Sequence, residues 1–494
     1  MKLHSMRKRQ LLSLLLAFLL TSTTMALAGC GQTETDTTAT ADTTAADTTP
    51  VETESETAYI DTLEERDLDG YSYRMVAQHT DSRPNFASSE ELTGEPLNDA
   101  IIQRKIATME RLNIQIEEIG YEDRGTLQND VSKTIRAGDD AYDIILTPLS
   151  AGINNLTTQN CLLDLVTVPH LTLESERWNA SIAENMRIDG KQYFTTGVTS
   201  VCHLYVPQTV LFNKELAANY GLPDLYEVVL DGKWTVDNMN TYMQDVTTDL
   251  NGDGELKPKD DQYACIVEGT FGNALYMAGG FQCVYPDANG NWAFHLTDAN
   301  SIDFIEKCAG IFGDKSRVYA DPNSDDQELY EAIFTEGRSL FVSASIRHAT
   351  NFREMECDFG VLPIPVLHEG DKYLVSCNTW LPAGIGVPVT CQDPERTGLI
   401  METMAAYSYD SILPAIVEKV LGKTARDEES YQIMMMMYEN TGFDFNTIMN
   451  FADTSSMLRS AVIGATENFV SSYAGVQKKA DTALAEFIAS CRGQ

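Results

Sequence analysis

Oxygen-bearing side chains alternate along the segment 249–260, whose sequence is DLNGDGELKPKD. This spacing is that of a twelve-residue calcium loop, in which carboxylate, amide and carbonyl oxygens surround a hard cation. Gly254 falls at the sixth position, where such a loop turns sharply, and Lys257 leaves the ninth position to water. The closing Asp suits its role less strongly than the bidentate Glu of an EF-hand, and a plain Asn-Gly, Asp-Gly turn is the alternative. The predicted calcium ligands are Asp249, Asn251, Asp253, Glu255 (through its carbonyl) and Asp260. A single loop of this kind predicts a structural calcium ion rather than a calcium sensor.

Motifs for catalysis are absent from the sequence. The seven histidines are dispersed, and neither HExxH nor GxSxG occurs. The segment Gly422-Lys423-Thr424 lacks the upstream glycine of a phosphate-binding loop, because Val417 stands there. We therefore predict no catalytic residue. With 73 acidic residues some carboxylates will lie close together, so counting alone does not exclude a glycosidase.

The first thirty residues predict export and lipidation. A basic start precedes an apolar run, 11–20, that is too short to span a bilayer. The sequence Leu27-Ala28-Gly29-Cys30 resembles a bacterial lipobox, in which the cysteine is lipidated and becomes the first mature residue. We predict a signal peptide at 1–29, lipidation of Cys30, and a lipoprotein held on the extracytoplasmic face of the cell membrane. The alternative is an ordinary signal peptide with an incidental cysteine.

The segment 30–58 is rich in Thr, Ala and acidic residues and contains no Lys or Arg, which predicts a disordered tether.

The net charge of −38 disfavours binding to nucleic acid and to anionic head groups. Nine cysteines follow Cys30 singly, without a CxxC pair. This odd, scattered set favours buried free thiols, although a disulfide between Cys265 and Cys283 remains open.

Strands alternate with helices after the tether. Period-two and period-3.6 patterns predict strands at 71–77, 114–119 and 142–146 and helices at 98–112 and 127–137. This rhythm indicates a mostly parallel sheet with helices on both faces. Ligands of such sheets gather beyond the carboxyl ends of the strands, here 79–83 and 147–151. A second series predicts strands at 208–212 and 359–363, helices from 213, at 302–312 and from Pro394, and a buried methionine-rich helix around 434–437.

Five segments in order resemble one protein family. They are DGKQY (189–193), LFNKEL (211–216), KWTVD (233–237), FTEGRSLF (334–341) and DFGVLPIP (358–365). Together they resemble the extracellular solute-binding proteins of ABC importers, specifically the maltose-binding-protein-like family 1, over roughly residues 65–490.

The resemblance implies an α/β, two-lobed periplasmic-binding-protein-like (type II) fold with discontinuous lobes and a hinge. By analogy the chain crosses between lobes near 200–205, near 351–358 and after Tyr409. The implied lobes are 59–203 plus 355–410 and 204–354 plus 411–494. The implied function is that of a monomeric, non-enzymatic receptor that closes around a solute and delivers it to the membrane subunits of an ABC importer. A carbohydrate or oligosaccharide is the expected solute. A receptor for peptides or other polar solutes is the alternative, and a secreted glycosidase or an adhesion protein is more remote.

Sugar sites stack rings on aromatic faces and satisfy hydroxyls with amides, carboxylates and arginine. Residues of these types stand where the resemblance places the cleft, although each also has a plain interpretation as a core aromatic or a solvated charge. The predicted ligand-binding residues are Trp380, Asn378, Tyr205, Arg347, Asp81, Arg83, Phe271 and Tyr276. Trp234 occupies a motif position that is more often structural.

Overall fold

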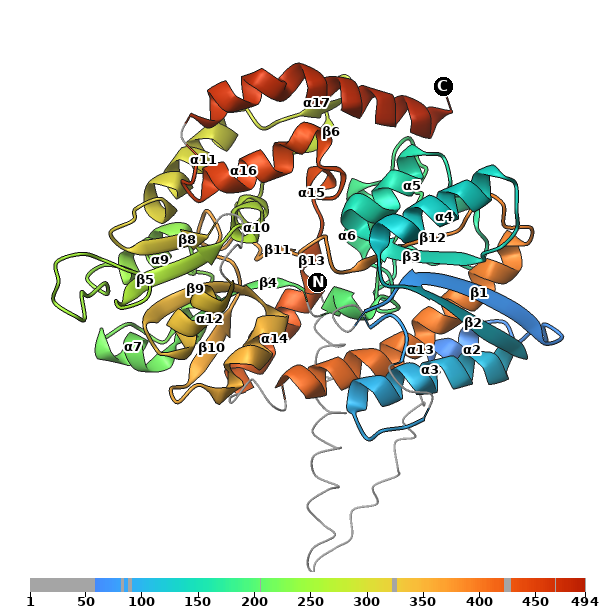
Figure 1. Cartoon of the computed structure of the whole chain (residues 1–494), viewed down its shortest axis with the longest axis horizontal. Coiled ribbons are helices and arrows are strands. Elements are labelled where there is room, and N and C mark those ends of the chain that lie inside the picture. Colours follow the sequence, from blue (N-terminus) through green and yellow to red (C-terminus); the bar gives the residue numbers. More distant parts are fainter. Residues whose placement is uncertain are drawn as a thin grey trace, which may run out of the picture. The chain divides into compact units, whose positions relative to one another are not determined.

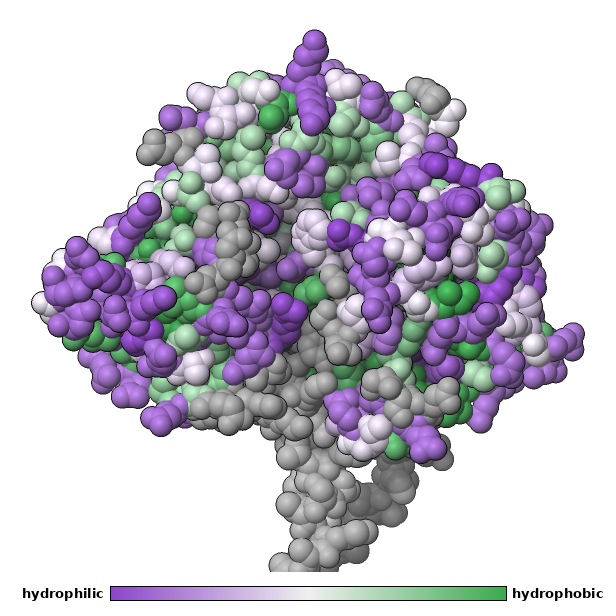
Figure 2. Space-filling view, in the orientation of Figure 1, coloured by the Kyte–Doolittle hydropathy of each residue, from purple (hydrophilic) through white to green (hydrophobic). Residues whose placement is uncertain are grey.

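The computed structural model of the chain describes residues 58–80, 84–87, 91–204, 206–321, 327–421, 428–466 and 468–493. These residues lie in one compact unit. The predicted signal peptide, Cys30 and nearly all of the tether lie outside them, as do Asp81, Arg83 and Tyr205. Hydrophilic side chains dominate the face shown in Figure 2, as the net charge of −38 leads one to expect.

A four-stranded sheet forms the centre of the first lobe (Figure 1), and its strand order is β12-β3-β1-β2. Strands β1, β2 and β3 are parallel, and β12 is antiparallel to β3. The strands are β1 (Tyr71–Gln78), β2 (Ile114–Tyr121), β3 (Ile144–Pro148) and β12 (Ala383–Gly386). The helices are α2 (Tyr59–Thr62), α3 (Pro96–Leu112), α4 (Arg124–Arg136), α5 (Asn154–Thr158), α6 (Ala180–Asn185) and α13 (Pro394–Leu421). The predicted βαβαβ order is therefore confirmed.

A five-stranded sheet of order β10-β4-β9-β5-β8 forms the centre of the second lobe. Its strands are β4 (Gln208–Asn213), β5 (Tyr263–Glu268), β8 (Val318–Asp321), β9 (Ser339–Ser345) and β10 (Phe359–Leu362). The helices are α7 (Lys214–Asn219), α8 (Leu225–Leu230), α9 (Val236–Tyr242), α10 (Thr270–Ala278), α11 (Ala299–Phe312), α12 (Gln327–Thr335) and α14 (Glu428–Glu439). A hairpin of β6 (Val284–Pro286) and β7 (Trp292–Phe294) is added to them. Trp234 is fully buried and its indole N–H donates to the carbonyl of Pro363 at 2.8 Å, which gives it the structural role expected.

Helix starts follow the capping residues of the sequence. The Asn213 side chain accepts from the N–H of Leu216, three residues on, and so ends β4 and begins α7. Asp393 accepts in the same way from the N–H of Arg396, directly before the proline that opens α13. Such caps satisfy N–H groups that the first helical turn leaves without partners.

The segments that cross between the two sheets differ in part from those predicted. The first crossing, through the 3₁₀ turn Val201–Leu204 into β4, lies where it was expected. The second does not, because β10 pairs antiparallel with β4 in the second lobe, so the predicted lobe boundary at 355 is wrong for this strand. The chain returns farther on, through β11 (Val375–Ser376), which pairs with β13 (Thr441–Gly442). Helix α13 continues to Leu421 rather than ending near Tyr409.

Three C-terminal helices, α15 (Phe445–Met449), α16 (Thr454–Val462) and α17 (Phe469–Arg492), complete the fold. Helix α16 packs against α10 and α11 of the second lobe. Helix α17 packs against α16 and β7 and then extends to α5 of the first lobe (Figure 1).

The last turn of α17 is bonded to the first lobe. The carbonyl of Cys491 accepts from the Tyr193 hydroxyl at 2.7 Å and from the Lys191 ammonium at 3.1 Å. The Arg492 guanidinium lies 2.6 Å from the Asp189 carboxylate. The predicted assignment of 411–494 to the second lobe alone is therefore incomplete.

The nine cysteines among the described residues are free thiols, and eight of them are buried while Cys357 is half-buried. The pairing of Cys265 with Cys283 that the sequence left open is not formed. Burial raises the pKa of both thiols, which keeps them protonated and unreactive at neutral pH. Among the helices of the described part of the chain, none has the length and apolar character needed to cross a bilayer.

Candidate ligand-binding site

A cavity of about 230 Å³ lies where the two lobes, the second crossing and the C-terminal helices meet. Its first-lobe wall is the turn after β3 together with α5, and its second-lobe wall is the start of β4 and of α10. The crossing segment 376–380 and helices α15 and α16 complete it. Most of the lining side chains carry a hydroxyl or an amide, among them Ser150, Asn154, Gln208, Thr270, Asn273, Asn378, Thr379, Asn450, Ser455 and Ser456. Such a surface exchanges hydrogen bonds with a polar ligand at many points.

A network of hydrogen bonds joins three chain segments at one edge of the cavity. The Ser150 hydroxyl lies 2.6 Å from that of Thr379 and donates to the carbonyl of Thr447 at 2.9 Å. The side-chain amide of Asn154 donates to the carbonyl of Ile448 at 3.1 Å. The first-lobe turn, the crossing segment and α15 therefore hold one another in place.

Helix α15 is also bonded to the second lobe through the residue that caps it. The Asp444 carboxylate accepts from the N–H groups of Asn446 and Thr447 at 2.9 and 3.1 Å, and from the N–H of Cys283 at 2.8 Å. Burial raises the pKa of Asp444, and these backbone donors oppose that shift. Because α15 is bonded to both lobes, a change in the distance between the lobes must break some of these hydrogen bonds or move α15.

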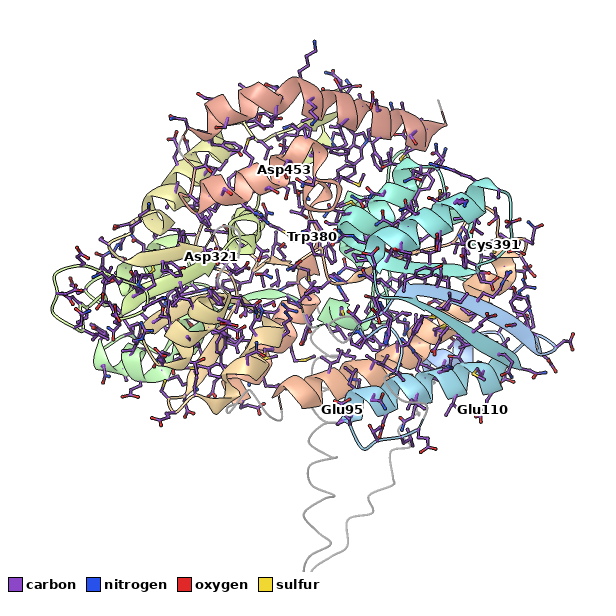
Figure 3. The ribbon with its side chains drawn as sticks, in the orientation of Figure 1. Glu95, Glu110, Asp321, Trp380, Cys391 and Asp453 are labelled. Atoms are coloured by element: carbon purple, nitrogen blue, oxygen red, sulfur yellow. The ribbon has the colours of Figure 1, made fainter. Side chains whose placement is uncertain are left out.

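Trp380 presents an aromatic surface to the cavity and is 44 % exposed. Figure 3 shows it between the helices of the first lobe and α10. The Asn378 side chain accepts from the Trp380 N–H at 2.9 Å, which fixes the turn that carries the indole. The guanidinium of Arg124, at the start of α4, lies 5.0 Å from the centroid of the indole ring, within cation–π range.

The second-lobe wall depends on a close approach of two helices at Gly272. A Cβ atom there would lie 2.2 Å from the carbonyl oxygen of Arg459, so only glycine lets α10 and α16 approach this closely. Across the same contact the Asn273 amide donates to the Ser455 hydroxyl at 3.0 Å. The buried Oδ1 of Asn273 and the buried Nε of Arg459 have no hydrogen-bond partner among the described residues. Both residues line the cavity, so a ligand bound there would lie beside two residues with unsatisfied polar groups.

Two turns beside the cavity have left-handed backbone at residues other than glycine. Ala151 has φ of 52°, and Asn450, Ala452 and Asp453 have φ of 45°, 50° and 64°. Such residues cost free energy and persist where the surroundings fix them, which is common at ligand sites. Ala151 and Asn450 both line the cavity, one from each side.

The structure separates the predicted ligand-binding residues into distinct groups. Trp380 and Asn378 line the cavity. Phe271 and Tyr276 were wrong, because they are 0 % and 2 % exposed and pack in the core on the inner side of α10. Arg347 is not among the residues that line the cavity. Asp81, Arg83 and Tyr205 lie outside the described residues.

Several residues that line the cavity were not predicted as ligand contacts. The position of 147–151 beyond a strand end indicated the segment that contains Ser150 and Ala151, but not these residues individually. Thr270 and Asn273 lie on the same helix as the two wrong aromatics, and Asn273 is only three residues from Tyr276, so a helical projection of α10 does not separate the two pairs. No local signal marks Arg459, because a tertiary contact far along the chain brings it to the cavity.

The backbone of the predicted calcium loop has the expected course. The Asp249 carboxylate accepts from the N–H groups of Gly252 and Gly254 at 2.7 and 2.8 Å, and both glycines have positive φ. The Lys257 ammonium lies 2.7 Å from the Asp253 carboxylate and 2.8 Å from that of Glu255. In this arrangement the described part of the chain brings no three His, Cys, Asp or Glu side chains together in a metal-binding group.

Two neighbouring carboxylates stand at the closing end of this loop. Asp260 is exposed, whereas the next residue, Asp261, is fully buried. The Asp261 carboxylate accepts from the N–H groups of Leu250 and Lys257 at 3.0 and 2.7 Å. Asp261 thus bonds the two ends of the loop together, and Asp260 stays a prediction as the closing calcium ligand.

Solved structures of sugar-binding proteins are similar to this chain over most of its length. The maltose-binding periplasmic protein of Listeria monocytogenes, in complex with maltose, has 15% sequence identity, covers 87% of this chain and 99% of its own, and gives a TM-score of 0.51. The cyclic α-maltosyl-1,6-maltose binding protein of Arthrobacter globiformis has 12% identity, covers 86% and 100%, and gives 0.54. The galacto-N-biose/lacto-N-biose I-binding protein of a Bifidobacterium longum ABC transporter has 12% identity, covers 85% and 98%, and gives 0.53.

At these identities the similarity defines the fold. The chain has the two-lobed α/β fold of the periplasmic sugar-binding proteins, as the five sequence motifs predicted. The three named structures are those of binding proteins. No family model and no curated protein sequence matches the chain.

Proposed function

We propose that the protein is a solute-binding receptor for a saccharide and delivers it to an ABC importer. The observation that carries the proposal is the polar cavity between the lobes, with one half-exposed tryptophan among hydroxyl and amide groups. A sugar ring has C–H faces that stack on an indole and hydroxyls around its rim that exchange hydrogen bonds. The similar structures named above bind sugars, which supports the same assignment.

The mode of action we propose is closure of the lobes around the solute, without catalysis. The cavity is lined from both lobes, so a ligand that contacts both walls stabilises the closed arrangement over the open one. A peptide receptor is the alternative. Hydroxyl and amide side chains predominate among the lining residues, and the lining includes an exposed tryptophan, which favours the saccharide.

We expect loss of the Trp380 indole to weaken saccharide binding by roughly 10- to 50-fold, because the ring loses its stacking surface. The full-length protein in detergent is first screened by thermal shift against mono- and oligosaccharides, polyols and short peptides. A ligand that binds only the folded protein raises its Tm by mass action. The dissociation constant of the responding sugar is then measured by calorimetry for wild type and Trp380→Ala.

Trp234→Phe is the matched control, since that tryptophan is buried away from the cavity. It should lower the Tm of the free protein and leave the dissociation constant unchanged. A response to peptides alone would replace the saccharide proposal by the peptide alternative. Equal affinity of Trp380→Ala and wild type would remove Trp380 from the site.

The receptor is further proposed to be a monomeric lipoprotein on the extracytoplasmic face of the cell membrane. The lipobox-like sequence before Cys30 and the polar segment after it support this. Cys30→Ser is expected to abolish lipidation and move the protein from the membrane fraction to the soluble fraction. Detergent phase separation measures the change. A Cys30→Ser protein that stays in the detergent phase as completely as wild type would contradict the anchor.

Calcium binding in the loop 249–260 is also proposed. The cation would displace the Lys257 ammonium from the carboxylate of Asp253, one of the predicted ligands. At about tenfold to hundredfold excess over its dissociation constant, calcium should raise the free energy of unfolding by about 1.4–2.7 kcal/mol. Tm measured with calcium and with chelator reports the effect.

Two variants test the calcium loop more sharply. Asp249→Ala should abolish the response, since the first ligand and the contact to Gly254 are both lost. Lys257→Met should strengthen calcium binding by about tenfold, because the competing ammonium is removed. No calcium response in wild type, or the same response in Asp249→Ala, would reject the site.

A further inference from the structure

The charge of the cavity points to the class of saccharide, and this inference rests on the proposed function. We infer that the site selects an acidic saccharide, one that carries a carboxylate, and that Arg459 is the residue that recognises it. None of the described residues that line the cavity is Asp or Glu, and Arg459 is the cation among them. This is unusual for a chain with 73 acidic and 35 basic residues.

Arg459 has a fixed backbone position, and its side chain has no ion-pair partner among the described residues. Its backbone is fixed against Gly272 at the contact of α10 with α16. Within the described part of the chain no carboxylate forms an ion pair with it, and its Nε is buried without a hydrogen-bond partner. A guanidinium fork of this kind matches the two oxygens of a carboxylate, which would supply both the missing acceptor and the missing charge.

A second guanidinium lies beside one of the lining residues. Arg124 of the first lobe lies over the ring of Trp380, so a sugar stacked on this indole would lie in its positive field. The carboxylate of the neighbouring Asp123 caps α4 through the N–H and hydroxyl of Thr126 at 2.7 Å each. Arg459 thus lines the cavity itself, and Arg124 contacts a residue that lines it.

The carboxylates nearest the lining residues are occupied by protein donors. Glu268 accepts from the hydroxyl of Thr270 and, at 3.1 Å, from its N–H. Asp453 accepts from the Asn450 amide at 3.0 Å. Asp444 accepts from three backbone N–H groups, as described above. None of the three is among the residues that line the cavity, so Arg459 is the charged side chain that a ligand would contact there.

The test compares ligands that differ in charge and hardly in shape. Calorimetry on the full-length protein measures trigalacturonate against its methyl ester, in which each carboxylate is neutral. Sialyllactose against lactose is a second pair, and maltose and galactobiose complete the neutral set. The acid of at least one pair should bind about 30-fold more tightly than its neutral partner. Added salt should weaken binding of the acid alone.

Variants of Arg459 then assign the charge to one residue. Arg459→Gln should weaken binding of the acid by about 30-fold or more and change binding of a neutral saccharide by less than about threefold. Arg459→Lys keeps the charge but loses the fork, and its affinity should lie between the two. Arg66→Gln is the control of equal charge change, because Arg66 pairs with exposed Glu64 and Glu395 away from the cavity.

The outcomes separate this inference from the receptor function. Neutral saccharides that bind as tightly as their acidic partners, or acid binding that Arg459→Gln leaves unchanged, would overturn the inference while the receptor proposal stands. Failure of every acidic and neutral saccharide to bind would overturn both. Preserved Tm of the free Arg459→Gln protein shows that a loss of binding is not a loss of folding.

Discussion

Replacing Glu402 by alanine is expected to lower the free energy of unfolding by about 4 kcal/mol. Glu402 is fully buried in the first lobe. One carboxylate oxygen accepts from the hydroxyls of Tyr59 and Thr172 at 2.7 and 2.5 Å. The other accepts from the N–H of Thr172 and the indole N–H of Trp178 at 3.1 and 2.8 Å. The two N–H donors cannot rotate, and each costs about 1–3 kcal/mol when it is left unsatisfied in a buried site.

Glu402→Gln is the matched control. Its amide oxygen can face the two N–H groups, and its NH₂ group can donate to the two hydroxyls, which are able to accept. We therefore expect Gln to cost only about 1 kcal/mol. Urea-induced unfolding, monitored by far-UV circular dichroism, gives both values. A loss of less than about 1 kcal/mol for Glu402→Ala would show that water reaches the donors and satisfies them.

Gly272→Ala is expected to destabilise the protein by about 2–3 kcal/mol and to weaken ligand binding by about tenfold. The new methyl group would lie 2.2 Å from the Arg459 carbonyl oxygen and 2.7 Å from its Cα. Both are backbone atoms, so relief requires α10 and α16 to move apart. The two helices carry Asn273 and Arg459 into the cavity, and separation displaces one polar wall relative to the other.

Gly310→Ala controls for helix propensity, because Gly310 lies in α11 and a Cβ there meets nothing within 4 Å. This change should stabilise the protein by about 0.5–1 kcal/mol, since alanine loses less backbone entropy in a helix. Thermal unfolding and calorimetry of the three proteins measure both effects. A Gly272→Ala protein as stable as Gly310→Ala would mean that the helix contact is looser than the structure shows.

The sequence predicts the elements well because their signals are local. The strand 144–148 begins with three large apolar residues, and the Asn213 and Asp393 caps fix where helices begin. The second lobe boundary failed for a nonlocal reason. Nothing within Phe359–Leu362 tells whether its partner is β4 of one sheet or β3 of the other. Pairing over such distances in sequence is set by the whole fold.

The residues of the candidate site likewise divide into those with a local sequence signal and those that only the tertiary fold brings to the cavity. Trp380 and Asn378 could be predicted because one short segment follows a recognisable strand. Phe271 failed because its residue type suits a sugar site and a core equally, and only the packing of α10 separates them. Arg459 could not be predicted, because its proposed role depends on the absence of Asp and Glu from the described cavity lining, which only the fold determines. The spacing of the predicted calcium loop drew attention to Asp260, which is exposed, and not to Asp261, which is buried and bonded to the loop backbone.

Helix α17 contacts both lobes and acts as a rigid brace between them. One end is packed on α16 and β7, and the other is bonded to Asp189, Lys191 and Tyr193 of the first lobe. A rigid brace keeps its length, so a wide rotation of one lobe against the other has to break the bonds at one end. Part of the free energy needed to separate the lobes is therefore the cost of breaking the bonds at the C-terminal end of α17. A fusion or tag placed directly after Arg492 would act on this brace.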